Sequence, residues 1–371
     1  MAHERMTRHH RRVVTTVIVV TQLVVALLTG GGVYAFYKHL DGNIKSGDEI
    51  DHIVGAPQDD APKEPLNILV MGQDSRDCAG CGIDNESGEG GSDTTILVHI
   101  SQDRQTAYGI SIPRDLLVDR PACTTTNADG ARTKVPAASG QMWNAAYALA
   151  GPACTVKQAE LLTHVRIDDY ITVDFGGFKS MVNALGGVEV CLAEPVDDNV
   201  AHIHFDAGRQ TLNGSEALQY VRERHGIGDG SDIGRMKRQQ SFIAAMIKKA
   251  VSAGTLSRPD KMLKFANAVS ESITTNPEIA SPTALVDLAE QLKDTDLTHI
   301  RFITAPNAAY PLGDPNWGRL YLLPQAKKLW KNVRDDAPLG KVFAAGSISA
   351  NKPNGTKGGK SEDMTRYGLC D

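Results

Sequence analysis

Charged side chains are absent from residues 13–37, although Asp, Glu, Lys and Arg make up 22% of the chain. A helix of that length, rising about 1.5 Å per residue, exceeds a bilayer hydrocarbon core of about 30 Å. The run is too long for the apolar part of a signal peptide, and no clean Ala-x-Ala site follows it. The sequence therefore predicts a membrane-spanning helix over residues 13–37, with a cleaved export signal as the alternative.

A second apolar stretch of this length does not occur, so the rest of the chain is expected on one side of the membrane. Arg11 and Arg12 precede the span, and the positive-inside rule places residues 1–12 in the cytoplasm as a short tail. Residues 38–65 are polar and rich in proline near their end, which predicts an extracytoplasmic stalk. The folded part is therefore expected outside the cell membrane.

Basic clusters are lacking beyond the N-terminus. The first twelve residues hold four arginines and one glutamate, so the remainder is more acidic than the formal net charge of −5 suggests. A protein that binds nucleic acid needs a broad basic face. The charge distribution argues against nucleic acid as a partner.

Cysteine is absent from the N-terminal segment, and all six cysteines lie beyond the predicted span. This placement favours a disulfide framework in an oxidising compartment, although six cysteines allow 15 pairings. Cys78 and Cys81 form a CxxC among glycines, where a local disulfide is the favoured interpretation. A zinc site would need a second pair at similar spacing, and the sequence has none.

Several catalytic signatures are also missing. There is no Gly-x-Ser-x-Gly elbow, and residues 88–91 lack the Gly-Lys-Ser/Thr that completes a nucleotide-binding loop. His202 and His204 could place two metal ligands on one strand face, but no third ligand is near in sequence. A solvent-exposed strand edge is the simpler interpretation.

Strand and helix patterns alternate along the chain, and some neighbouring strands are joined too briefly for crossover connections. Strands are predicted at residues 68–71, 95–100, 107–112, 170–175, 188–192 and 299–304. Helices are predicted at residues 141–150, 155–165, 177–185, 215–220, 232–251, 259–269 and 281–292. We expect an α/β fold, a single α-β-α layered domain with a mixed central sheet over residues 66–333. Residues 334–371 are rich in Gly, Lys and Asn and are expected to form a flexible tail.

Charged residues sit at the ends of the first three predicted strands. Asp74 and Arg76 follow one, Asp93 precedes the next, and Arg114 and Asp115 follow the third. Strands that deliver charge at their ends build a site at a sheet edge. Carboxylates bind divalent cations and arginines bind phosphate, so the site is predicted to bind a cation together with a phosphate-rich ligand.

A second arginine group lies far along the chain. Arg222 and Arg224 would share a face only in extended backbone, and they could equally be two unrelated surface arginines. Asp232 is expected to cap the long helix that follows, and a helix N-terminus suits phosphate. Polar residues on the first turns of that helix are Arg235, Arg238 and Gln239.

Seven blocks in order resemble the LytR–CpsA–Psr family of membrane-anchored cell-wall proteins. They are NILVMGQDSR, SDTTILVHI, ISIPRDL, NAAYALAGP, VDFGGFKSMVNALGGVEV, GRQTLNGSEALQYVRER and DIGRMKRQQ. The resemblance implies a phosphotransferase that moves a glycopolymer from a polyprenyl-pyrophosphate lipid onto peptidoglycan through a phosphodiester. A pyrophosphatase acting on the same lipid-linked glycan, or a non-catalytic lipid-binding regulator of envelope synthesis, is the alternative.

The resemblance also implies residue roles. Asp74 and Asp93 match metal-binding carboxylates, with Mg²⁺ as the expected cofactor and Mn²⁺ as a substitute. Residues matching those that hold the pyrophosphate are Arg114, Arg222, Arg224 and Gln239, and supporting roles fall to Arg76, Asp115, Arg235 and Arg238. Two positions depart from the family pattern. Gly91 replaces a common arginine, and residues 141–143 replace a common lysine, for which Lys134 is a candidate substitute.

Overall fold

The computed structural model describes residues 2–55, 64–74, 91–126, 130–198, 203–223, 226–252, 258–292, 295–356 and 361–370. The chain divides into two compact units, Met1–Asn43 and Ile44–Asp371. The first is the helix α1 (Ala2–Asn43), and its part from Val13 to Asn43 is long and apolar enough to cross a membrane. The predicted span thus lies within a helix that continues six residues past Tyr37, to Asn43.

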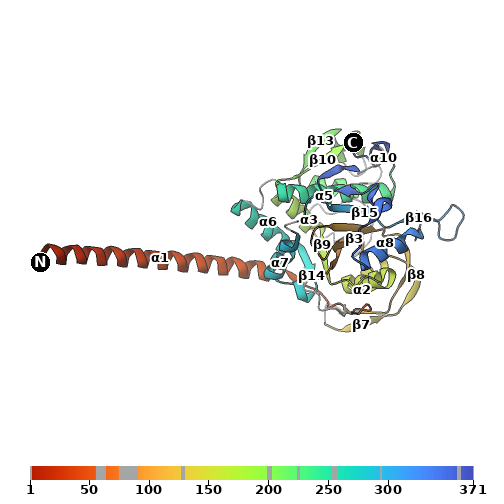
Figure 1. Ribbon diagram of the computed structural model, residues 1–371. Helices are drawn as coiled ribbons and strands as arrows, with labels where there is room; N and C mark the ends of the chain where they lie inside the picture. Colours follow the sequence, from red (N-terminus) through yellow and green to blue (C-terminus); the bar gives the residue numbers. More distant parts are fainter. Residues whose placement is uncertain are drawn as a thin grey trace. The chain divides into compact units, whose positions relative to one another are not determined.

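Nine strands of the described residues form one mixed sheet in the second unit (Figure 1). In spatial order they are β1 (Lys45–Ser46), β14 (Ile273–Thr275), β9 (Asp169–Asp174), β2 (Leu66–Gln73), β3 (Ser92–Ile100), β4 (Ala107–Ile112), β15 (Ile300–Thr304), β18 (Ile348–Ser349) and β19 (Lys352–Thr356). The central hairpins β2–β3 and β3–β4 are antiparallel, whereas β2 pairs with β9 and β4 with β15 in parallel. The mixed sheet confirms the predicted fold class.

Helices cover both faces of this sheet, as Figure 1 shows. On one face lie α2 (Ala145–Thr163) and α8 (Gln325–Arg334), and on the other lie α3 (Phe175–Ala184), α4 (Gly214–Arg222) and α5 (Asp232–Ser252). Alternate strand residues serve the two cores: Leu97 packs with the first group, and Ile100 with Val182 and Phe242 of the second. These residues of α3 and α5 are therefore core.

The remaining elements are short. The helices are α6 (Pro259–Ser272), η1 (Pro277–Ile279), α7 (Pro282–Leu292), α9 (Gly340–Ala344) and α10 (Ser361–Arg366). The two-stranded sheets pair β5 (Leu117–Arg120) with β8 (Ala138–Met142), β6 (Cys123–Thr126) with β7 (Arg132–Val135), β10 (Val188–Leu192) with β13 (Gly208–Leu212), β11 (Val196–Asp198) with β12 (Ile203–Phe205), and β16 (Asn307–Ala309) with β17 (Leu320–Leu322).

Local chemistry explains where the site-bearing helices begin. Asp174 caps α3 by accepting a hydrogen bond of 2.7 Å from the Gly177 amide. The long helix α5 begins as predicted, but Ser231 supplies the cap in place of Asp232, because its Oγ accepts from the Gly234 amide at 3.0 Å. Both caps lie next to the strand ends that carry the charged residues.

The predicted stalk is wrong for residues 44–54, which pack on the second unit. Strand β1 joins the edge of the sheet beside β14, and Ile50 packs against the core of the α2 face. The Tyr170 hydroxyl donates to the Asp48 carbonyl at 2.8 Å, and Glu160 accepts from the Ile53 amide at 2.8 Å. The segment is polar on average, but a few apolar side chains and its backbone hydrogen bonds are enough to hold it on the fold.

The expected flexible tail over residues 334–371 is also wrong for its described part. Strands β18 and β19 extend the central sheet, and Ile348 and Leu369 are completely buried. Cys370 forms a disulfide with Cys191, and a second disulfide joins Cys123 to Cys154. The expectation of disulfides is confirmed for these four cysteines, whereas Cys78 and Cys81 lie outside the described residues. The Gly-, Lys- and Asn-rich composition of residues 334–371 predicted a flexible tail, because the few apolar residues that pack into the core are widely spaced.

Candidate functional site

Strand register brings the first set of charged residues together. Antiparallel pairing sets Gln73, at the end of β2, opposite Ser92, at the start of β3. It also sets Thr95 of β3 opposite Ile112, at the end of β4. The residues that flank these points therefore meet at one end of the sheet, as the sequence predicted. They are Asp74, Asp93, Arg114 and Asp115.

One half of the site is built on Arg114. Its Nη1 donates to Asp93 Oδ1 at 2.6 Å, and its Nε lies 3.5 Å from Asp115 Oδ2. Burial by itself raises the pKa of Asp93, but the charge and hydrogen bond of Arg114, aided by other nearby arginines, outweigh burial and lower that pKa. Asp93 is consequently a carboxylate throughout the neutral range.

The other half is built on Arg222, the last residue of α4. Its Nη2 lies 3.8 Å from Asp74 Oδ2, and its guanidinium lies 4.5 Å from the centroid of the Phe175 ring. The expected extended backbone is wrong at Arg222, because α4 includes Arg222 and Glu223 is its C-cap. Arg224 lies outside the described residues, so the predicted pair is described for Arg222 alone.

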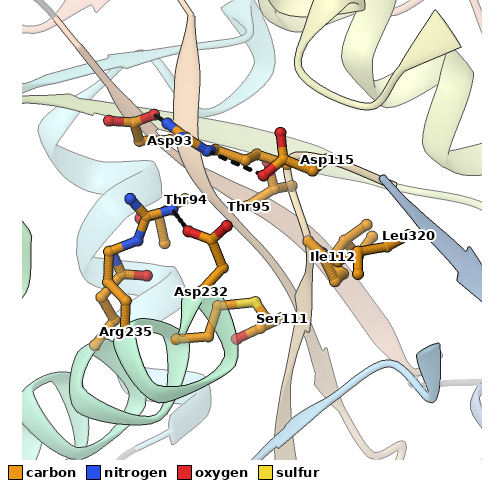
Figure 2. A pocket seen from close by; sticks show the side chains of 13 residues that line it. Asp93, Thr94, Thr95, Ser111, Ile112, Asp115, Asp232, Arg235 and Leu320 are labelled. Carbon is orange, nitrogen blue, oxygen red and sulfur yellow. Dashed lines mark hydrogen bonds and ion pairs between the residues drawn. The ribbon is translucent and has the colours of Figure 1, made fainter. Parts of the chain in front are cut away.

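The N-terminal turns of α5 close the site. Arg235 Nη2 lies 2.9 Å from Asp232 Oδ1, and the Gln239 amide donates to the Val221 carbonyl at 3.2 Å. Figure 2 shows Asp232 and Arg235 facing Asp93, on β3, and Asp115, in the turn after β4, across the pocket. Helix and sheet together line a small hollow that opens to solvent. Its walls are Asp93, Thr94, Thr95, Ser111, Ile112, Pro113, Arg114, Asp115, Asp232, Arg235, Met236, Gln239 and Leu320.

Arg238 has a different position from the one predicted. It is fully buried and donates to the backbone carbonyls of Glu223, Ile227 and Tyr367. Burial lowers its pKa, and the hydrogen bonds hold the loop between α4 and α5. Arg238 therefore supports the site through this loop and is not one of the residues that line the hollow. Arg76 lies outside the described residues.

Two contributors were missed in the sequence. Arg319 Nη1 lies 3.7 Å from Asp115 Oδ1 although the two residues are far apart in the chain, and nothing local to Arg319 signalled this contact. Phe175, the first residue of α3, supports Arg222 through its ring face, and its place directly after the β9 strand could have suggested this.

The two departures from the family pattern have different structural settings. A Cβ at Gly91 would lie 3.7 Å from the Asn144 side-chain nitrogen, which is ordinary contact, so space at this point does not require glycine. Lys134 is exposed on β7 and pairs through its backbone with Thr124 in an outlying hairpin. Among the described residues, no ion pair or hydrogen bond joins the Lys134 side chain to a site residue.

The donor chemistry suits a hard divalent cation. Asp74 and Asp93 bring two carboxylates to one sheet end, and Mg²⁺ typically takes one or two carboxylates plus water and substrate phosphate. Among the described residues there is no group of three His, Cys, Asp or Glu able to hold a metal. Asp74 and Asp93 are the described carboxylates at this sheet end that could contribute to holding such a cation.

Comparison with known proteins gives consistent matches. The model of the LytR_cpsA_psr family matches residues 36–335. Cell wall biosynthesis protein LcpA of Corynebacterium glutamicum is 31% identical over 280 residues, covering 68% of this chain and 52% of LcpA. The Bacillus subtilis teichoic acid transferase TagV is 33% identical over 261 residues, covering 68% of this chain and 61% of TagV. The chain thus spans about half to three fifths of these relatives.

The solved structures agree on the fold. The crystal structure of Bacillus subtilis TagV superposes with a TM-score of 0.54 at 29% sequence identity, covering 74% of this chain and 99% of that chain.

Proposed function

Because the chain belongs to the LytR_cpsA_psr family, we propose that it is a Mg²⁺-dependent phosphotransferase of cell-wall assembly. It moves a glycopolymer from a polyprenyl-pyrophosphate carrier onto peptidoglycan. The relative TagV is named a polyisoprenyl-teichoic acid–peptidoglycan teichoic acid transferase, which supports this substrate class. The observation that carries the proposal is the pair of carboxylate–arginine contacts, Asp93 with Arg114 and Asp74 with Arg222, at one end of the sheet.

The proposed reaction exchanges one phosphorus–oxygen bond for another. A hydroxyl oxygen of the acceptor bonds to the phosphorus that carries the glycopolymer, and the bond from that phosphorus to the bridging oxygen breaks. Polyprenyl phosphate leaves with the bonding electron pair, and the hydroxyl proton passes to solvent. Such a transfer depends on positioning and charge neutralisation more than on covalent help from the protein.

The charged residues divide this work. Asp74 and Asp93 would hold Mg²⁺, which when bound neutralises charge on the phosphate oxygens. Arg114 and Arg222 donate hydrogen bonds to the remaining oxygens, and the ring of Phe175 fixes the plane of the Arg222 guanidinium. The carboxylate–arginine contacts keep these charges compensated before the substrate arrives.

The proposed location is the cell membrane. The charge-free part of α1 crosses the bilayer with residues 1–12 in the cytoplasm, and the unit Ile44–Asp371 lies outside. The disulfides Cys123–Cys154 and Cys191–Cys370 support an oxidising compartment for that unit.

The test supplies the full chain in detergent with a lipid-linked glycan, Mg²⁺ and a peptidoglycan acceptor. Covalent transfer and release of polyprenyl phosphate are measured together. Asp93→Ala or Arg222→Ala is expected to abolish both, whereas Arg209→Ala, at an exposed ion pair with Glu189, retains both. Wild-type turnover in either site variant refutes the site assignment, and release without transfer identifies a pyrophosphatase.

A further inference from the structure

The hairpin formed by β16 and β17 carries the most exposed aromatic side chain of the second unit. Trp317 is 64% exposed and Leu312 is 86% exposed, and both lie in the loop between the two strands. Figure 1 shows this loop projecting from the body beyond β16. Exposed apolar side chains that lie together can serve as an interaction surface.

The hairpin borders the proposed active site. The Leu320 amide donates to the Asp115 carbonyl at 3.1 Å, and Leu320 also forms a parallel bridge with Leu116. Arg319 lies 3.7 Å from the Asp115 carboxylate, and Leu320 is part of the wall of the hollow. Figure 2 shows Leu320 beside Ile112 at the end of β4. The surface of the hairpin is therefore continuous with the wall of the hollow, and a molecule bound to the hairpin would lie beside it.

Hydrogen bonds hold the backbone of the loop around Trp317. The Trp317 amide donates to the Asp314 carbonyl at 2.9 Å, and the Asn316 amide donates to the Asp314 carboxylate at 2.7 Å. Gly318, with φ +84°, permits the turn that follows, and the Arg319 amide closes it on the Asn316 carbonyl at 2.9 Å. A loop whose backbone is already ordered loses little backbone entropy on binding a ligand.

The composition of the hairpin distinguishes between a glycan and a bilayer. Residues 305–323 contain no lysine, and their single arginine, Arg319, pairs with Asp115. A membrane-binding arm presents lysines and arginines to anionic headgroups. Sugar rings instead offer apolar C–H faces to an aromatic ring and hydroxyl groups to polar neighbours such as Asp314 and Asn316. The chemistry therefore favours a sugar polymer.

We propose that the β16–β17 hairpin binds the glycan strand of the peptidoglycan acceptor, with Trp317 as its stacking platform. This inference rests on the proposed function, because it assigns the acceptor side of that reaction. The lipid-linked pyrophosphate occupies the hollow, and the acceptor approaches along the hairpin past Leu320. Trp317 is a specificity-determining residue for the acceptor and takes no part in bond breaking.

Tryptophan fluorescence tests binding without activity. The chain has three tryptophans, and Trp143 and Trp330 are 0% and 3% exposed, so acrylamide quenching reports chiefly on Trp317. The full chain is placed in phosphatidylcholine nanodiscs, and soluble peptidoglycan glycan strands are added. Protection of the fluorescence from acrylamide by the glycan is expected. Absence of protection by the glycan refutes the proposal. Protection that appears in phosphatidylglycerol nanodiscs when no glycan is present also refutes it, because the loop would then bind anionic lipid.

Kinetics with Trp317→Ala give the second test. The KM for the acceptor glycan is expected to rise about tenfold, while release of polyprenyl phosphate without acceptor stays at the wild-type rate. Trp317→Phe retains a ring and restores most of the affinity, and Val342→Ala, another exposed apolar position, is the control. An unchanged acceptor KM refutes the hairpin proposal alone. Failure of the wild type to transfer or release refutes the proposed function, while the quenching test still decides glycan binding.

Discussion

The two ends of strands β2 and β3 use similar residue types for opposite purposes. At one end Asp93 pairs with Arg114 in the wall of the hollow, and Asp74 lies 3.8 Å from Arg222. At the other end, the paired residues Asn67 and His99 belong to a polar cluster whose hydrogen bonds are made within the fold. The difference lies in the partners that each carboxylate finds.

At the second end most partners are backbone amides and side chains of the fold, including His52 beside Glu160 and Arg166 beside Asp168. His99 lies 2.8 Å from the Asn67 side chain and 3.0 Å from Asp336, and burial lowers its pKa. Asp168 accepts from the Asn67 amide at 2.7 Å, and burial raises its pKa to about 6. Glu160 is completely buried and accepts from three backbone amides. These carboxylates join segments of the fold, and the guanidinium of Arg166, 3.9 Å from Asp168 Oδ1, itself donates to the Val54 carbonyl.

A buried carboxylate is therefore a poor guide to function by itself. Arginines beside Asp93 lower its pKa in spite of burial, whereas burial dominates at Asp168. The end with compensated, partly exposed opposite charges is the one suited to an anionic substrate.

The largest effect is expected at the arginine end. Arg114→Ala removes a phosphate donor and leaves Asp93 without its closest cation, so the rate of polyprenyl phosphate release should fall about 10³-fold. Activity of the full chain in detergent measures this, with Arg209→Ala as the control of equal size. A loss below tenfold would place phosphate binding elsewhere.

The next effect is on stability, at the opposite end. Glu160→Gln removes a buried charge that binds the amides of Ile53, Val54 and Ile167, and should lower the free energy of unfolding by about 3 kcal/mol. Urea unfolding of the full chain measures the change, with the exposed Glu189→Gln as control. Activity per folded molecule should be unchanged, and a specific loss of activity would contradict the structural role.

The pH dependence of stability should have opposite signs at the two ends. The folded pKa of Asp168, about 6, exceeds its ordinary value of 3.8, so stability falls as pH rises between these values. Asp168→Asn removes this dependence and should gain on the order of 1 kcal/mol over the wild type between pH 4 and 7, after allowing for solvent screening.

The contribution of Asp93 has the reverse sign. Its folded pKa is lowered, so its stabilisation is present above pH 3.8 and is lost as pH falls through the folded pKa. Unfolding curves recorded across pH for the wild type, Asp168→Asn and the exposed Asp287→Asn control measure both effects. If raising the pH from 4 to 6 increased the free energy of unfolding of the wild type, and Asp168→Asn abolished that increase, the sign given for Asp168 would be contradicted.

The smallest effect concerns the support of Arg222. Phe175→Leu keeps apolar volume but removes the ring face, and kcat/KM for the lipid substrate should fall roughly threefold. Phe178→Leu, on the same helix but packed against Phe242, serves as the matched control. Equal losses in both variants would show that general packing, and not the ring under the guanidinium, is responsible.

Local patterns in the sequence were sufficient to predict the α/β class, the main strands and the first half of the site. Asp93 and Arg114 flank neighbouring strands joined by short connections, so their proximity follows from sheet pairing alone. The apolar span and the start of the long helix likewise depend on short-range composition and capping.

Only the tertiary structure decided which groups from distant parts of the chain join Asp93 and Arg114 in the site. The sequence placed Arg238 in the site, but packing directs it to backbone carbonyls, while Arg319 reaches Asp115 from a remote hairpin. The docking of residues 44–54 and of the C-terminal strands likewise depends on a few apolar side chains and on long-range backbone pairing. Side-chain direction and non-local pairing are set by the assembled core, and no local spacing encodes them.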